Sequence, residues 1–138
     1  MTKTVEITGR ISLILKVELT ASLLSALTAR IFASEHEADT GPRSVWHLPG
    51  YQDKFYAILL EEPRVAIGTI YVAGTNDRAD VAWWIDSMYR RMGYGRETIE
   101  VLASMLIAKG VTRIGPLLVI GDYEASRRLA QQLRSHFE

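Results

Sequence analysis

The sequence predicts a mixed α/β domain in which an antiparallel meander is followed by a βαβ half. Three strand-like segments, 54–60, 65–72 and 80–85, follow one another with only short turn-like connections. Connections of that length join antiparallel strands. After residue 97 the pattern changes to helix, strand and helix, the order of a βαβ crossover that holds ligands at the carboxyl ends of its strands. A chain of 138 residues is expected to form one domain, 1–138.

The elements before the meander follow from local patterns. Segments 5–8 and 11–17 are expected as strands, joined at Gly9-Arg10 by a bulge or a tight hairpin turn. Thr20 is a candidate N-cap for a helix. The apolar residues of that helix share one face: Leu23, Leu24, Leu27 and Ile31. Residues 34–52 contain Gly-Pro and Pro-Gly pairs, so we expect a loop with at most a short helix.

The second half contains two expected helices around one strand. Residues 97–109 carry an apolar stripe at helical spacing, and Gly110 fits the C′ position that ends a helix. Residues 112–120 form a nearly continuous apolar run, as expected of a strand buried on both faces. Asp122 can cap a last helix. The apolar residues of that helix are again at helical spacing: Ala125, Leu129 and Leu133.

Composition excludes several classes of protein. The formal net charge is +0, from 16 basic and 16 acidic side chains, which argues against broad electrostatic binding to nucleic acid or to a membrane. With no cysteine, there is no thiolate metal site and no cysteine nucleophile. The first residues lack a signal-peptide apolar region, and runs such as 11–15 are too short to span a bilayer. A cytoplasmic protein is therefore expected.

Residues 83–97 form the most informative stretch, because an apolar strand there runs into a basic loop, two glycines and a helix. Gly93 and Gly95 permit positive φ and let a ligand approach the backbone. The free N–H groups and the dipole of a helix start favour an anion. Three arginines add positive charge: Arg90, Arg91 and Arg96. We interpret the stretch as a pyrophosphate-binding turn; the alternative is a solvated helix start.

The run Arg90-Arg91-Met92-Gly93-Tyr94-Gly95 fully matches Q/R-x-x-G-x-G/A, the pyrophosphate motif of GNAT-type N-acetyltransferases, which the chain resembles from about residue 11 onward. Segments 65–70 and 82–95 look most like the ribosomal-protein N-acetyltransferase branch. The resemblance implies a GNAT-like mixed sheet and acetyl transfer from acetyl-CoA to a primary amine of a protein, peptide or small molecule, without a metal. The cofactor-binding residues it implies are Ile85, Asp86, Arg90, Arg91, Met92, Gly93, Tyr94, Gly95 and Arg96.

The sequence departs from the family pattern in its last third. Tyr123 stands where the family usually has an asparagine at the start of the last helix, and Ala130 where many members carry a catalytic tyrosine. The sequence ends at Glu138, where the family continues into two more strands, so we expect a C-terminally shortened fold. Compensation by the strand at 5–8 or by a second copy is expected, since an open sheet edge promotes association. A homodimer is therefore predicted.

Without a cysteine, direct attack by the amine in a ternary complex is the expected mechanism. A base must then take the proton of the amine, directly or through water. Asp80 matches a fourth-strand position where the resembled branch often carries glutamate, and Glu61 and Glu62 are the alternates. Tyr123 is the candidate for protonating the leaving thiolate. By family analogy, a backbone N–H at the end of the fourth strand, near Ile85 or Asp86, would stabilise the oxyanion. The alternative interpretation is that each of these residues is a solvated surface residue or a packed residue with no catalytic role.

The acceptor is less determined by the sequence. Several aromatic residues either line an acceptor groove or, as we favour, belong to the core. They are Trp46, His47, Tyr51, Phe55 and Tyr56. Residues 35–39 resemble a weak metal cluster but are better read as a solvated helix end. One other function stays open, that of a catalytically inactive acyl-CoA-binding or interaction protein of the same fold. Another, a dinucleotide-binding domain, fails on context, because Thr98 replaces the third glycine and the motif follows an antiparallel meander instead of the first strand of a βαβ unit.

Overall fold

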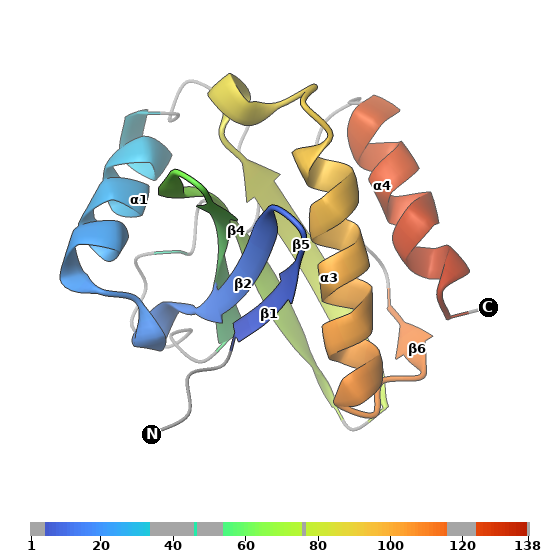
Figure 1. Cartoon of the computed structure of the whole chain (residues 1–138). Coiled ribbons are helices and arrows are strands. Elements are labelled where there is room, and N and C mark those ends of the chain that lie inside the picture. The colour runs from blue at the N-terminus through green and yellow to red at the C-terminus, as the bar shows by residue number, and fades with distance from the viewer. Residues whose placement is uncertain (1–4, 34–45, 47–53, 76, 116–123, 138) are drawn as a thin grey trace.

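The computed structural model describes residues 5–33, 46, 54–75, 77–115 and 124–137 (Figure 1). Within them, six strands form one sheet in the order β1-β2-β3-β4-β5-β6. Strands β1 to β5 pair as antiparallel neighbours, and β6 pairs parallel to β5. The predicted antiparallel meander with a parallel continuation is confirmed. The strands are β1 (Val5–Thr8), β2 (Ile11–Leu15), β3 (Phe55–Glu61), β4 (Arg64–Thr75), β5 (Arg78–Ile85) and β6 (Arg113–Ile114).

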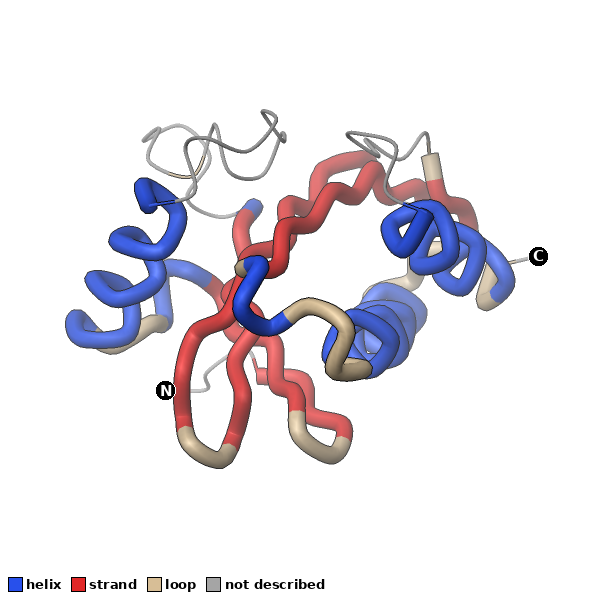
Figure 2. The backbone as a smooth tube through the Cα atoms, turned by 90° about the horizontal axis from the view of Figure 1, so that it is seen from above, coloured by secondary structure: helices blue, strands red, loops and turns tan. Residues whose placement is uncertain are grey.

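Helices cover both faces of the sheet (Figure 2). Helix α1 (Ala21–Ala33) lies on one face, and α3 (Tyr94–Ala108) and α4 (Glu124–Ser135) lie side by side on the other (Figure 1). Two 3-10 turns, η1 (Lys16–Glu18) and η3 (Ser87–Tyr89), follow β2 and β5. The result is a three-layer arrangement with the sheet in the middle.

Two apolar clusters hold these layers together, one on each face of the sheet. Ile85 of β5 belongs to the cluster beneath α3, which includes the fully buried Leu102. The next side chain along the strand, Trp84, belongs to the cluster beneath α1, together with Leu27. Adjacent residues of a strand point to opposite faces, so β5 contributes to both clusters and is fixed from both sides.

Helix and turn signals in the sequence are confirmed. The Thr20 side chain accepts a hydrogen bond from the Leu23 N–H at 3.3 Å, as an N-cap does. Gly110 follows the last residues of α3 with φ +89°, the left-handed conformation expected at C′. Gly9 makes the turn of the β1–β2 hairpin with φ +61°. Helix α3 begins at Tyr94, earlier than the predicted residue 97, so it starts inside the glycine pair.

The predicted strand 11–17 is too long. Strand β2 ends at Leu15, and the chain enters η1 because Lys16 turns inward instead of continuing the strand. Its ammonium group donates to the Trp46 carbonyl and lies 4.4 Å from the Trp46 ring centroid. Burial lowers the pKa of Lys16. Such a long-range contact leaves no local signal in the sequence.

Part of the predicted second half lies outside the described residues. Of the predicted strand 112–120, Arg113–Ile114 is confirmed as β6, whereas residues 116–123, including Asp122 and Tyr123, are not described. The expected loop at 34–52 is likewise outside the described residues except for Trp46.

Strand β1 covers the β2 edge of the sheet, at the side opposite β6. It therefore adds a strand at the β2 edge of the sheet and does not cover the β6 edge. Among the residues that the structure describes, β6 has no strand partner on its outer edge. The homodimer stays a prediction.

Candidate active site

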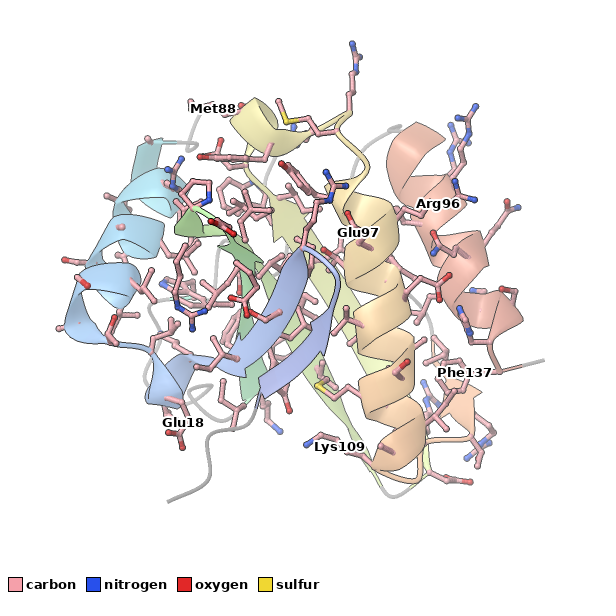
Figure 3. All side chains as sticks on the ribbon, in the orientation of Figure 1. Glu18, Met88, Arg96, Glu97, Lys109 and Phe137 are labelled. Carbon is pink, nitrogen blue, oxygen red and sulfur yellow. The ribbon has the colours of Figure 1, made fainter. Side chains whose placement is uncertain are left out.

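The loop from β5 to α3 is held by its own side chains. The Asp86 carboxylate accepts a hydrogen bond from the Met88 N–H at 3.3 Å and so caps η3. The Arg90 side chain turns back, and its Nε donates to the Ile85 carbonyl at 2.7 Å. Met88 itself projects from η3 with 69% of its surface exposed (Figure 3). The loop is therefore a folded connection with a defined path from the strand to the glycines.

Asp86 also ties this loop to α1. Its carboxylate is buried and pairs with Arg30 at 3.0 Å. The same guanidinium donates to the Tyr89 hydroxyl at 3.4 Å and lies 5.2 Å from the centroid of that ring. An ion pair this well shielded from water loses little to screening. The contact fixes α1 against the loop that leads into α3.

The start of α3 has the geometry of an anion-binding turn. Gly93 is the N-cap, with φ +82° and ψ 0°, and no side chain caps the helix. The first backbone hydrogen bond there runs from the Glu97 N–H to the Gly93 carbonyl at 3.3 Å. The N–H groups of the first turn therefore precede the helical hydrogen-bond ladder and can bind an anion. A side chain at Gly93 would be strained, because L residues rarely adopt this φ.

Gly95 has a different reason to be glycine. A Cβ built on it would lie 3.0 Å from Cδ1 of Leu129 on α4 and 3.5 Å from Cδ1 of Ile85. The missing side chain thus lets α3 pack closely on α4 and on the end of β5. The sequence pattern predicts ligand approach at both glycines, whereas the contacts at Gly95 give it a packing role.

Arg10, at the tip of the β1–β2 hairpin, contacts the start of α3 and was missed by the sequence analysis. Its Nε donates to the Glu97 carboxylate at 2.7 Å, and its Nη2 donates to the Met92 carbonyl at 3.3 Å. Its guanidinium also lies 4.5 Å from the centroid of the Tyr94 ring. Hydrogen bonding to Glu97 raises the pKa of Arg10. No local pattern could identify this pair, whose members are 87 residues apart.

The charge around the turn suits a phosphate ligand. Glu97, in the first turn of α3, would repel an anion, but Arg10 offsets its charge. Arg91 and Arg96 are exposed, and Arg96 projects from the first turn of α3 beside Glu97 (Figure 3). An uncapped helix start with a net positive surround fits the pyrophosphate of a coenzyme A thioester. The assignment of residues 85–96 to this role stays a prediction.

Asp80, the first candidate base, lies near the other end of β5. It precedes Ile85 by five positions, which is about 17 Å along a strand. Its carboxylate is 3.2 Å from both Nε and Nη2 of Arg78. The structure therefore does not place Asp80 beside the glycine turn. The two can share one ligand only if that ligand extends along β5.

The alternate bases lie at the end of the sheet that carries the glycine turn. Glu61 ends β3 and pairs with Arg64 across the β3–β4 turn. Its N–H donates to the Arg10 carbonyl at 2.9 Å, which places this turn next to the β1–β2 hairpin. Glu62 is exposed in the same turn. Tyr123, the candidate acid, lies outside the described residues.

Successive peptide groups of β5 point alternately toward β4 and away from it, which limits the N–H groups that can serve as oxyanion donor. The Asp86 N–H donates to the Ile67 carbonyl of β4 at 2.8 Å, so it is already used. Ile85 faces Gly68 as a non-hydrogen-bonded pair, and its N–H therefore points away from β4. By the same alternation the Ala79 carbonyl points to β6, where it accepts from the Gly115 N–H at 2.7 Å. Val81 and Trp83 share this orientation.

Other sequence interpretations are also resolved by the packing. Trp46, Phe55 and Tyr56 are buried, with the Trp46 and Phe55 rings in edge contact at 5.2 Å, so these aromatics form core and not an open groove. His47, Tyr51 and residues 35–39 are outside the described part of the chain. In the described residues, no group of three or more His, Asp or Glu side chains could hold a metal ion. No helix there is both long and apolar enough to cross a membrane.

Comparison with known proteins agrees with what the geometry indicates. A model of the acetyltransferase (GNAT) family matches residues 24–134. The chain belongs to this family. As a GNAT-family protein it is an acyltransferase of the N-acetyltransferase type. No curated protein matches the chain by sequence.

Solved structures of other GNAT proteins share the fold. A GNAT-family acetyltransferase from Bacillus anthracis matches with a TM-score of 0.69 and 13% identity, over 94% of this chain and 82% of that one. Ribosomal-protein-S5-alanine acetyltransferase from Vibrio fischeri gives 0.66 and 15%, over 94% and 81%. The Salmonella typhimurium enzyme that modifies the N-terminal serine of ribosomal protein L7/L12 gives 0.65 and 14%, over 91% and 80%. The resemblance to the ribosomal-protein branch is confirmed at the level of fold.

Proposed function

We propose that the protein transfers the acetyl group of acetyl-CoA to a primary amine by direct attack in a ternary complex. The observation that carries the proposal is the start of α3, where Gly93 is left-handed and no side chain caps the helix. First-turn N–H groups there would hold the pyrophosphate, with Arg91 and Arg96 as neighbouring cations. Arg10 keeps Glu97 from repelling it.

The backbone of β5 supports an extended position for the rest of acetyl-CoA. Peptide groups of Val81, Trp83 and Ile85 point away from β4, and the described pairing with β6 involves only Arg78 and Ala79. The length between Ile85 and Asp80, about 17 Å, is comparable to that of an extended pantetheine arm. A thioester carried to this end would be near Asp80, with the Val81 N–H as the oxyanion donor. A thioester near Ile85 would instead be too far from Asp80.

The reaction needs one proton removed and one supplied. The amine nitrogen attacks the thioester carbonyl carbon, a C–N bond forms, and the C–S bond breaks. Asp80 takes the proton of the amine, directly or through a water molecule. Tyr123 is proposed to give a proton to the leaving thiolate. Glu61 and Glu62 are the alternate bases if the acetyl group lies at the opposite end of the sheet.

A protein amine is the acceptor class that the structural neighbours favour. The Salmonella typhimurium and Vibrio fischeri enzymes act, by their names, on an N-terminal serine and on a ribosomal protein alanine. We propose that the acceptor of this protein is an amine of a protein, a peptide or a small molecule. We also propose that the protein acts in the cytoplasm. A homodimer is proposed on the ground that the outer edge of β6 has no strand partner among the described residues.

The first test is calorimetric titration of the protein with acetyl-CoA, with NADH as the control ligand, followed by turnover assays on an amine panel. Saturable binding of acetyl-CoA alone, together with turnover, is the expected result. Binding without turnover of any amine would favour the inactive acyl-CoA-binding alternative. Binding of NADH would contradict the assignment of the turn to coenzyme A.

The role of Asp80 is tested by Asp80→Asn. General-base catalysis contributes about 10²–10⁴-fold, so kcat should fall in that range while the dissociation constant of acetyl-CoA is unchanged. Glu61→Gln is the matched control at the other end of the sheet. Loss of turnover in Glu61→Gln with normal turnover in Asp80→Asn would move the base to the β3–β4 turn.

A further inference from the structure

A basic pocket lies at the end of β5 that is farthest from the glycine turn. It has a volume of about 390 Å³ and is lined by Arg78, Arg113, Ile114, Gly115 and Arg134. The three arginines come from β5, β6 and the last turn of α4. Three elements separated in the sequence thus converge on one open hollow at the edge of the sheet. None of the residues assigned to the pyrophosphate-binding turn lines this pocket.

The charges in this pocket are only partly balanced. Arg78 and Arg113 face each other in the β5–β6 register, a placement that is unfavourable for like charges. Arg78 is paired with Asp80 at 3.2 Å, and Arg113 with Asp77 at 3.3 Å. Arg134 has no ion-pair partner within the described part of the chain. Counting the described residues alone, the pocket therefore has one more positive than negative charge, beside two arginines that already lie close together.

The proposed base, Asp80, lies against Gly115, one of the residues that line this pocket. A Cβ built on Gly115 would lie 1.7 Å from Oδ1 of Asp80 and 2.7 Å from Nε of Arg78. The Asp80 carboxylate and the Arg78 guanidinium thus lie directly against the backbone that lines the pocket. Any larger residue at position 115 would displace both side chains. Asp80 is not itself part of the lining; its carboxylate lies next to the pocket, paired with the lining Arg78.

We propose that this pocket binds an anionic group of the acceptor, so that the acceptor is an amine with a carboxylate or phosphate close by. This inference rests on the proposed function, because it takes Asp80 as the base. An ammonium beside a carboxylate complements Asp80 beside Arg78, and planar guanidinium groups bind carboxylate and phosphate bidentately. The surplus charge of Arg134 favours acceptors with a net negative charge. Amines without an anion leave that charge unpaired.

Such an acceptor has two sources, a free amino acid or the amino end of an acidic peptide. Glutamate and a peptide with acidic second and third residues are therefore assayed separately, each against its amide counterpart. We expect kcat/KM to be higher for the acidic member of a pair. Arg134→Met should lower the ratio of acidic to amide kcat/KM by about 10- to 150-fold, the range for a lost charge-assisted hydrogen bond.

The matched control is Lys109→Met, which removes a positive charge at the far end of α3 from Glu97, outside the pocket lining (Figure 3). Its acidic-to-amide ratio should equal that of the unchanged protein. Arg134→Gln serves as a second variant if Arg134→Met unfolds, which thermal melting would show. Equal preference for acidic and amide acceptors in the unchanged protein would overturn the inference and leave the acetyltransferase proposal standing.

A binding measurement separates the two proposals. Succinate is titrated into protein saturated with coenzyme A, so that the phosphate-binding turn is filled. We expect saturable binding that is lost in Arg134→Met and kept in Lys109→Met. If no amine is acetylated but succinate binds in this pattern, the pocket stands and the proposed reaction fails. If succinate does not bind to the unchanged protein, the pocket proposal fails.

Discussion

Replacing Gly93 by valine tests whether the start of α3 binds a phosphate. Gly93 has φ +82° and ψ 0°, and a Cβ there would meet only Nη2 of Arg10 at 3.4 Å. That atom is the end of a flexible side chain, so the steric cost is small. The left-handed conformation itself costs an L residue about 1–2 kcal/mol. For a domain of this length, the melting temperature should fall by about 3–8 °C.

The expected effect on acetyl-CoA is larger than the effect on stability. The valine side chain would stand between the ligand and the first-turn N–H groups. Each hydrogen bond to a charged group contributes about 1.5–3 kcal/mol. Loss of one such bond weakens binding about 10- to 150-fold, and loss of two removes measurable binding. Calorimetric titration with acetyl-CoA, beside a thermal melt, measures both quantities on the same sample.

Gly110→Val is the matched control at the opposite end of α3. Gly110 has φ +89°, and a Cβ there would meet no atom within 4 Å. The backbone strain is therefore the same, without any ligand nearby. We expect an equal loss of melting temperature with an unchanged dissociation constant. Wild-type affinity in Gly93→Val, or an equal loss of affinity in both variants, would refute the assignment of this turn to the pyrophosphate.

Three other perturbations have defined outcomes. Asp86→Asn should cost about 3 kcal/mol in urea unfolding, because it breaks a buried ion pair, and the double variant with Arg30→Met should cost less than the sum. Arg10→Met should weaken acetyl-CoA binding by exposing the Glu97 carboxylate, and Glu97→Gln added to it should restore the affinity. The hydrogen bond from Arg113 lowers the pKa of Asp77. The interaction therefore stabilises the fold above the unfolded pKa, near 3.8, and this stabilisation is lost as pH falls through the folded pKa. Melting temperatures should therefore differ between wild type and Asp77→Asn at neutral pH, and converge in acid.

The features that the sequence predicts correctly are those with local causes. Thr20 can cap a helix because its hydroxyl reaches an N–H three residues later. Gly110 can end one because it tolerates positive φ. The Gly93 turn is of the same kind, since strand, glycine and helix are consecutive in the chain. The meander is predictable because short connections allow only antiparallel pairing.

The features that could not be predicted depend on contacts between distant segments. Arg10 meets Glu97 across 87 residues, and Arg30 meets Asp86 across 56. Neither pair has a spacing that a helix or strand would reveal. The early end of β2 depends on Lys16 reaching the Trp46 carbonyl, again through the fold. The role of Gly95 required its neighbour Leu129 to be known.

The basic pocket belongs to the same unpredictable class, although each of its residues is visible in the sequence. Arg78 and Arg113 become neighbours only through the parallel β5–β6 register. Arg134 reaches them because α4 packs beside α3 and ends at the β6 side of the sheet (Figure 1). The net charge of the whole chain, +0, gives no sign of this pocket, because the excess of positive charge is local.

Strand β5 separates the two proposed binding regions by a fixed distance. The glycine turn follows its carboxyl end, and the basic pocket lies at its amino end, about 25 Å away along eight residues. Both faces of the strand are packed, so the separation cannot adjust. Substitutions that far apart act additively when they share no partner. The changes in the free energy of unfolding caused by Gly93→Val and by Arg134→Met should therefore add in the double variant. A strong coupling between them would mean that the two regions are joined by a conformational change, and not by the rigid strand alone.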